Sequence, residues 1–151
     1  MAIGTVLSKK RTAEILLVED NIADVLLTKK AFSNATIPCH ITVANNGEEA
    51  MTILHRPDGP EAAPMPDLVL LDLNLPKKSG IEVLREMKTD KKLWHIPVVV
   101  LTTSRADKDI ADCRALYVNA YVVKPLDFGK FQSFAEALVQ FWFAYAISPY
   151  E

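Results

Sequence analysis

Short apolar runs alternate along the chain with longer stretches whose apolar positions recur at helical spacing. The short runs predict five strands, at Ile15–Val18, His40–Ala44, Leu68–Leu71, Pro97–Leu101 and Ala120–Val123. The longer stretches predict helices over Ala23–Phe32, from Asn46 to near Arg56, over Ser79–Lys88, over Lys108–Leu116, and from about Asp127 onward. Five alternations of strand and helix predict an α/β fold, in which helices cover both faces of one doubly wound parallel sheet.

Local signals support these boundaries. Asn46 and Ser79 are predicted helix caps, each with a glutamate three residues later. The segment Pro57–Pro66 contains four prolines and one glycine, which predicts a surface loop. Leu68–Leu71 is apolar without alternation, as in a central parallel strand that is covered on both faces.

The length of 151 residues suits one domain, and half of the residues are hydrophobic. The formal net charge of −2 gives no electrostatic reason to expect binding to nucleic acid or an anionic membrane. The apolar run Phe141–Ile147 is too short to span a bilayer, and the basic residues at 9–11 are placed wrongly for a secretory signal. Cys39 and Cys113 are isolated, so we expect reduced thiols and a cytoplasmic protein.

Polar side chains follow four of the predicted strands, at the edge of the sheet where ligands of doubly wound folds bind. These residues are Glu19 and Asp20, Asp72, Thr102 and Thr103, and Lys124 with Pro125. Carboxylate oxygens are ligands that Mg²⁺ prefers, and a carboxylate can also attack phosphorus. The set therefore predicts Mg²⁺-assisted phosphoryl transfer. In this scheme Asp20 holds the metal, Asp72 attacks, Lys124 pairs with the phosphoryl oxygens and Thr102 hydrogen-bonds to one of them.

Four segments resemble, in order and spacing, the motifs of the CheY-like response regulator receiver family. They are Leu16–Asn21, Leu71–Pro76 followed by Gly80, Pro97–Thr103, and Tyr121–Pro125. The resemblance runs from about Glu14 to Gln140, and it implies a flavodoxin-like strand order of 2-1-3-4-5 with an extended C-terminal helix. It also implies a division into a tail at 1–13, a receiver domain at 14–140 and a helix extension with its tail at 141–151.

The resemblance assigns roles to the same residues. Asp72 would take a phosphoryl group from the phosphohistidine of a sensor histidine kinase. Asp20, Asp72 and the backbone carbonyl of Asn74 would bind one Mg²⁺ ion directly, and Glu19 would bind it through water.

Two further features are implied. Thr102 and Tyr121 would form a switch pair, in which the hydroxyl turns to the phosphate and the ring turns inward behind it. The Lys124–Pro125 peptide bond would be cis, which is a geometry found almost only before proline.

More narrowly, the chain resembles the small response regulators that partner cyanobacterial phytochromes. The similarity rests on Leu73–Gly80, the proline-rich loop, and the aromatic pair of Phe141 and Trp142. Two positions depart from the family pattern. Leu116–Asn119 replaces a smaller Gly-Ala junction, which we expect to change the shape of this part of the surface. Thr103 is bulkier than the usual residue, which we expect to alter the kinetics of phosphotransfer.

The C-terminal helix carries more apolar residues than one face can bury. Phe141, Trp142, Phe143 and Tyr145 are the residues that we assign to a homodimer interface. The alternative is a tail that folds back on its own domain.

Each residue of the site also has an ordinary structural interpretation. Asp72 alone would be a helix cap or loop residue, Lys124 a surface lysine, and Thr102 a hydroxyl that is satisfied locally; Tyr121 would be a half-buried core tyrosine. Together they favour a single-domain, non-enzymatic response regulator that signals by protein contact. An aspartyl-phosphate hydrolase would need a second aspartate where Asn74 stands. A nucleotide-binding domain would need a glycine-rich phosphate loop, and the five glycines are too far apart to form one. A scaffold that acts without phosphorylation is the remaining alternative.

Overall fold

One parallel sheet with strand order β2-β1-β3-β4-β5 forms the centre of the molecule. This computed structural model describes residues 12–56, 64–124 and 127–145, with side chains up to residue 142. The strands are β1 (Ala13–Val18), β2 (Cys39–Ala44), β3 (Leu68–Leu71), β4 (Val98–Thr102) and β5 (Ala120–Val123). The helices are α1 (Ile22–Ser33), α2 (Gly47–Leu54), α3 (Gly80–Thr89), α4 (Asp107–Ala115) and α5 (Phe128–Val139), which continues as the π-helix η2 (Gln140–Tyr145). The predicted fold and strand order are confirmed.

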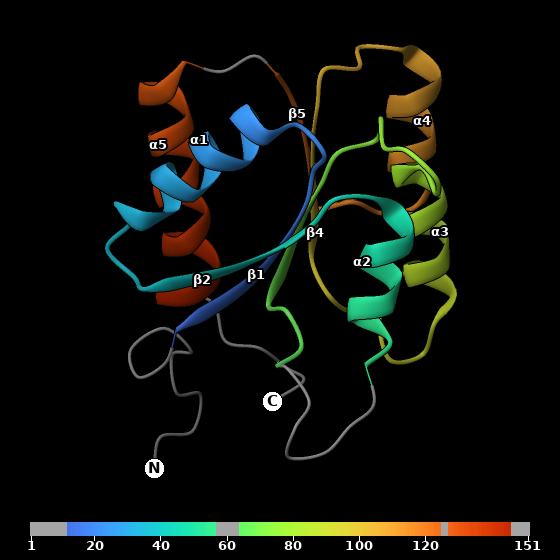
Figure 1. The fold of residues 1–151 in the computed structure, drawn as a ribbon, viewed down its shortest axis with the longest axis horizontal. Helices are drawn as coiled ribbons and strands as arrows, with labels where there is room; N and C mark the ends of the chain where they lie inside the picture. The colour runs from blue at the N-terminus through green and yellow to red at the C-terminus, as the bar shows by residue number, and fades with distance from the viewer. Residues whose placement is uncertain (1–11, 57–63, 125–126, 146–151) are drawn as a thin grey trace.

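The helices form two layers, with α1 and α5 on one face of the sheet and α2, α3 and α4 on the other (Figure 1). Alternate residues of each strand point into one of two hydrophobic clusters. Leu16, Val18 and Val69 belong to the cluster under α2–α4, whereas Ile15 and Leu17 belong to the cluster under α1 and α5. Because both faces are covered, the central strands are continuously apolar.

Several predicted boundaries shift by one or two residues. Helix α1 begins at Ile22, because the side chain of Asn21 accepts a hydrogen bond from the backbone N–H of Asp24 and caps the helix. Helix α2 ends at Leu54, before the predicted Arg56. Thr102 is the last residue of β4 and does not follow the strand, since it pairs with Val123 of β5.

The predicted caps at Asn46 and Ser79 are confirmed, each accepting a hydrogen bond from the glutamate N–H three residues later. The glutamates themselves differ. The carboxylate of Glu82 completes a capping box by accepting from the N–H of Ser79, whereas that of Glu49 accepts from the N–H of Asn45.

The loop between β3 and α3 packs directly on the start of α2. A Cβ atom on Gly47 would lie 2.0 Å from the carbonyl oxygen of Lys78, so only glycine allows this approach. Lys78 also pairs with Glu86 of α3 at 2.5 Å. The loop that follows the proposed phosphoacceptor is therefore anchored on both sides.

The C-terminal helix packs on the sheet through Phe131, Ala135 and Val139, which are buried. Its outer side is joined to the loop before β2 through Glu136, whose carboxylate accepts hydrogen bonds from the N–H and hydroxyl of Thr36 and from Gln140. Among the described residues, no helix is both long and apolar enough to cross a membrane.

Candidate functional site

Three carboxylates meet at the carboxyl edge of the sheet. Strands β1 and β3 are neighbours in register, with Val18 opposite Leu71, so the residues that follow them lie side by side. Carboxylate oxygens of Glu19, Asp20 and Asp72 all lie within 4.8 Å of one another. Glu19 and Asp72 are buried, whereas Asp20 is exposed. The sequence prediction that these three residues converge is confirmed.

This donor set fits a hard divalent cation. All three groups offer oxygen, their spacing allows one ion to contact more than one of them, and the exposure of Asp20 leaves room for water and a phosphoryl oxygen. Asn74 is exposed, and its backbone N–H donates to Oδ1 of Asp72 at 3.1 Å. This hydrogen bond fixes the Asp72 carboxylate and leaves its other oxygen, Oδ2, for chemistry.

Lys124 brings its ammonium group into the same cluster from the end of β5. The Nζ atom lies 2.5 Å from Glu19 Oε1, 2.9 Å from Asp24 Oδ2 and 3.4 Å from Asp72 Oδ2. Burial alone would lower the pKa of this lysine, but the hydrogen bonds to Glu19 and Asp24 outweigh it and raise the pKa above its ordinary value. The ammonium is therefore charged and buried, beside the oxygen that we expect to attack phosphorus.

Glu19 shows the opposite balance. Burial raises its pKa above the ordinary value, although the hydrogen bond from Lys124 works against this shift. The neighbouring charge of Asp72 adds to the rise. Burial and the charge of Asp72 thus disfavour the ionised form of Glu19. A cation bound nearby would stabilise this form, so the electrostatics favour a metal site here.

Asp24 is a site residue that our sequence analysis missed. It lies in the first turn of α1, four residues after Asp20, and its carboxylate contacts Lys124 directly. The signal was present: Asp24 stands in the first turn of a helix whose N-cap, Asn21, directly follows the acidic pair. The contact itself depends on the reach of Lys124 across the sheet edge, which spacing alone does not define.

Thr102 and Tyr121 are linked through Ser104. The buried hydroxyl of Thr102 accepts a hydrogen bond from the N–H of Ser104, and the hydroxyl of Tyr121 donates to the carbonyl of the same residue at 3.0 Å. The Ser104 hydroxyl donates to Asp109 of α4. A movement of Thr102 would therefore be felt by Tyr121 and by the start of α4. Ser104 and Asp109 were also missed in the sequence.

The structure describes both positions that depart from the family pattern, Thr103 and the junction at 116–119. Thr103 is exposed beside the site. At the end of α4, Tyr117 takes a left-handed conformation with φ 58°. Its N–H bonds to the carbonyl of Arg114, and that of Val118 bonds to Cys113, which completes a Schellman motif where glycine is usual. Pro125, the site of the expected cis bond, lies outside the described residues.

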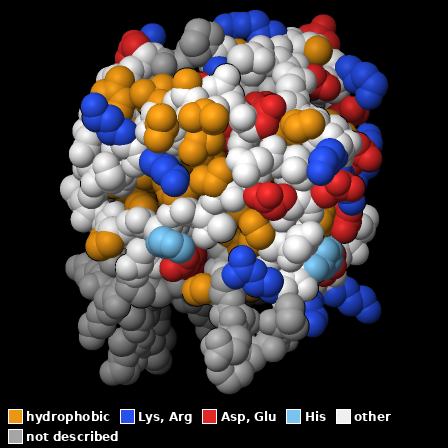
Figure 2. All heavy atoms as spheres, viewed as in Figure 1, with side chains coloured by type: hydrophobic (Ala, Val, Ile, Leu, Met, Phe, Trp, Pro, Cys, Tyr) orange, Lys and Arg blue, Asp and Glu red, His pale blue; other side chains and the backbone are white. Residues whose placement is uncertain are grey.

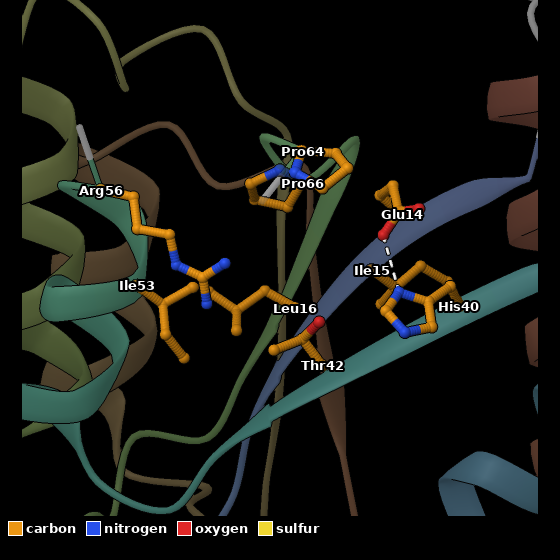
Figure 3. Close-up of a pocket in the computed structure, with 9 residues that line it drawn as sticks. All are labelled: Glu14, Ile15, Leu16, His40, Thr42, Ile53, Arg56, Pro64 and Pro66. Atoms are coloured by element: carbon orange, nitrogen blue, oxygen red, sulfur yellow. Dashed lines mark hydrogen bonds and ion pairs between the residues drawn. The ribbon is translucent and has the colours of Figure 1, made fainter. Parts of the chain in front are cut away.

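A second concavity lies at the other end of the sheet. It has a volume of about 40 Å³, and the pair of Glu14 and His40, 2.8 Å apart, lies on its β1–β2 side (Figure 3). Arg56, Pro64 and Pro66 line the opposite side. A volume of this size holds about one water molecule, so this cavity is too small to be the functional site in place of the acidic edge.

A doubly wound sheet that carries an acidic cluster and one buried lysine at its carboxyl edge defines the class of phosphate-accepting receiver proteins. Comparison with known proteins agrees: a family model described as the response regulator receiver domain matches residues 15–136. The chain belongs to the response regulator receiver domain family.

Two curated relatives cover most of the chain. Response regulator Rcp1 of Synechocystis sp. is 41% identical over 128 residues, which are 85% of this chain and 87% of the relative. The probable methanogenesis regulatory protein FilR2 of Methanothrix harundinacea is 38% identical, over 97% of this chain and 94% of the relative.

Solved structures give the same result. The phosphorylated cyanobacterial phytochrome response regulator RcpA is 42% identical with a TM-score of 0.83, over 92% of this chain and 99% of that one. The Mn²⁺-bound form of Rcp1 matches with a TM-score of 0.80 at 39% identity, over 91% of this chain and 99% of that one. This chain is therefore a response regulator closely related to phytochrome response regulators.

Proposed function

We propose that Asp72 is the phosphoacceptor of this response regulator and that a histidine kinase is the phosphoryl donor. The observation that carries the proposal is the position of Asp72, buried at the sheet edge with one oxygen held by the N–H of Asn74 and the other facing Lys124. Phosphorylation of an aspartate is the general function of receiver domains, and this aspartate lies within the acidic cluster.

The reaction is a displacement at phosphorus. An oxygen of Asp72 forms the new O–P bond, while the N–P bond of the donor phosphohistidine breaks and its electron pair returns to the imidazole. Lys124 neutralises charge on the phosphoryl oxygens, and the Thr102 hydroxyl turns from Ser104 to donate to one of them. We propose that Asp20, Asp72 and the Asn74 carbonyl would hold Mg²⁺, with Glu19 acting through water, and that the ion would supply further positive charge at these oxygens.

Incubation with acetyl phosphate and Mg²⁺ tests this function. Wild type should gain the mass of one phosphoryl group, and Asp72→Ala should gain none. Lys124→Ala should react more slowly, because a buried counter-charge is lost. A wild type that stays unmodified would leave the scaffold function, in which the receiver fold acts without phosphorylation.

We also propose that the kinase is a phytochrome, because RcpA, 42% identical to this chain, is described as a cyanobacterial phytochrome response regulator. Ile22 and Leu26 offer a contact surface: they lie on α1, start two residues after Asp20, and are 76% and 63% exposed. Hydrophobic side chains gather over the α1 side of the molecule in Figure 2. An exposed apolar patch beside a reaction site suits a macromolecular donor.

Comparing two phosphoryl donors, the kinase and acetyl phosphate, distinguishes loss of kinase docking from loss of phosphoryl transfer. Ile22→Asp and Leu26→Asp should lower the phosphotransfer rate from the kinase about tenfold, as for central interface residues. Both variants should react normally with acetyl phosphate. Tyr117→Ala, which removes an exposed aromatic residue elsewhere, is the control. An equal loss with both donors would contradict docking at α1.

Homodimerisation through the C-terminal helix remains our proposal. Phe141 is 60% exposed, while Trp142 is partly buried against the α1–α5 cluster and meets the Phe141 ring edge-on at 5.0 Å. The side chains of Phe143 and Tyr145 lie outside the described residues. On the same helix a shallow groove of about 480 Å³ is lined by the small residues Gly129, Ser133 and Ala137, among others.

The groove can accept the Phe141 ring of a second copy, which would make the contact self-complementary. Sedimentation of wild type should then show a dimer that Phe141→Ala dissociates. Tyr117→Ala is again the control. A monomeric wild type would favour a helix that only packs on its own domain.

Three further points belong to the proposal. Receiver domains that signal by protein contact are in general not enzymes, and we propose the same here, with one self-modification per signal. Cys39 and Cys113 are free, and we propose a cytoplasmic protein with reduced thiols. We retain 14–140 as the receiver domain and 141–151 as its extension, without contact to nucleic acid or membrane.

A further inference from the structure

The ammonium group of Lys124 is not centred among its three carboxylates. Its contacts to Glu19 and Asp24, at 2.5 and 2.9 Å, have the length of full charge-assisted hydrogen bonds, whereas Asp72 lies at 3.4 Å. The ammonium therefore bonds more strongly to Glu19 and Asp24 than to Asp72. The weakest contact is the one to the residue that must act as nucleophile.

Asp24 is held firmly enough to direct a neighbouring side chain. Its backbone N–H donates to Oδ1 of Asn21 at 3.0 Å, and its carbonyl accepts from the Thr28 hydroxyl at 2.7 Å. Its carboxylate stands in the first turn of α1, where the helix dipole favours negative charge. The side chain is 32% exposed, so it remains partly solvated.

We propose that Asp24 is a positioning residue, which draws the ammonium of Lys124 away from Asp72 and so leaves the attacking oxygen available. The inference rests on the proposed function of Asp72. Without Asp24, the ammonium would lie between Glu19 and Asp72 alone, and its contact to Asp72 would shorten. A carboxylate oxygen that is engaged in a full ion pair is a poorer nucleophile and a poorer metal ligand.

Asp24→Asn removes the charge while keeping the size of the side chain and the backbone hydrogen bonds of α1. Asp107→Asn is the matched control, because Asp107 is an exposed carboxylate in the first turn of α4, a helix that also follows the carboxyl edge of the sheet. Thermal unfolding of the three proteins reports whether the substitutions change the fold.

The first readout needs neither metal nor donor. Nitrogen-15 NMR of labelled lysine side chains follows the exchange of the Lys124 ammonium hydrogens with water, with Lys124→Ala to assign the signal. Loss of one partly exposed ion pair should speed this exchange about threefold in Asp24→Asn. Asp107→Asn should match wild type. Equal exchange rates in Asp24→Asn and wild type would overturn the proposal.

The second readout is the initial rate at which acetyl phosphate and Mg²⁺ modify the protein, where the O–P bond to acetate breaks as the bond to Asp72 forms. Asp24→Asn should react about threefold more slowly than Asp107→Asn. A faster reaction would mean that Asp24 competes for Lys124 and hinders the transfer, which also overturns the proposal. If wild type forms no adduct, the function of Asp72 fails, and the ammonium exchange still decides whether Asp24 holds Lys124.

Discussion

Gly80 and Asp72 lie so close together that a Cβ atom on Gly80 would stand 2.3 Å from the carbonyl oxygen of Asp72. The same atom would lie 2.6 Å from the Cα atom of Leu73. Both neighbours are backbone atoms and cannot rotate away. The start of α3 thus packs against the backbone of the proposed phosphoacceptor, and the helix supports the site.

Gly80→Ala should disturb this contact. We expect the free energy of unfolding to fall by about 1–3 kcal/mol, as in other overpacked sites, and the reaction of Asp72 with acetyl phosphate to slow. Gly129→Ala is the control, because its Cβ would meet only Asp127 Oδ1 at 3.4 Å. Urea unfolding measures the free energy of unfolding of both variants. Equal stability of the two variants would show that the contact is easily relieved.

Asp20→Asn should stabilise the metal-free protein. Asp20 adds a further negative charge within 4.8 Å of Glu19 and Asp72, and one lysine cannot balance the cluster. Removing the charge should raise the free energy of unfolding by about 1 kcal/mol and weaken Mg²⁺ binding. The measurement is the urea midpoint with and without Mg²⁺. A lower midpoint with an unchanged slope in the metal-free protein would contradict this expectation.

Tyr117→Gly should also raise stability. Tyr117 has φ 58° and is 82% exposed. Its left-handed backbone therefore costs free energy, and its exposed ring contributes little packing to offset that cost. Glycine at this position of the Schellman motif should stabilise the protein by about 1 kcal/mol. Tyr117→Ala should show no such gain, because alanine keeps the strain. Thermal unfolding compares them; a destabilised glycine variant would mean that the exposed ring contributes packing.

The hydrogen bonds of Glu136 predict a pH dependence. The bond from the Thr36 hydroxyl, followed by that from Gln140, lowers the pKa of Glu136 below its ordinary value of 4.5. A lowered carboxyl pKa contributes stability above the unfolded value, and this stability is lost as pH falls through the folded value.

Wild type should therefore be more stable than Glu136→Gln at neutral pH, by about 0.5 kcal/mol for such a partly exposed group. The difference should shrink as pH falls through the folded pKa of Glu136 and vanish once the carboxyl is protonated in both states. Urea unfolding over this range is the measurement, with Glu48→Gln on the exposed side of α2 as control. A difference that persists at low pH would show that packing, and not charge, distinguishes the two side chains.

The strands of the sheet could be predicted from the sequence because buried strands consist of apolar residues. Leu68–Leu71 and Val98–Thr102 are buried throughout, and their unbroken apolar runs are the pattern of a strand covered on both faces. The convergence of Asp20, Asp72 and Lys124 followed from topology alone, since parallel strands bring their carboxyl ends to one edge.

Contacts made by long side chains were not predictable in the same way. Lys124 reaches Asp24 across the sheet edge, and Lys78 pairs with Glu86 of α3. Such pairs depend on rotamers and on the angle of a helix to the sheet, and neither is encoded in residue spacing. Trp142 shows the same limit: its inward packing depends on how α5 continues past Val139.

The central claim is that Asp72, and no other carboxylate of the cluster, forms the bond to phosphorus. Borohydride reduction after treatment with acetyl phosphate and Mg²⁺ converts an acyl phosphate at an aspartate to homoserine, which peptide mass spectrometry locates in the chain. The structure predicts homoserine at position 72 of wild type and at no other carboxylate of the cluster. Homoserine at position 20 or 24, or none at all, would contradict the account.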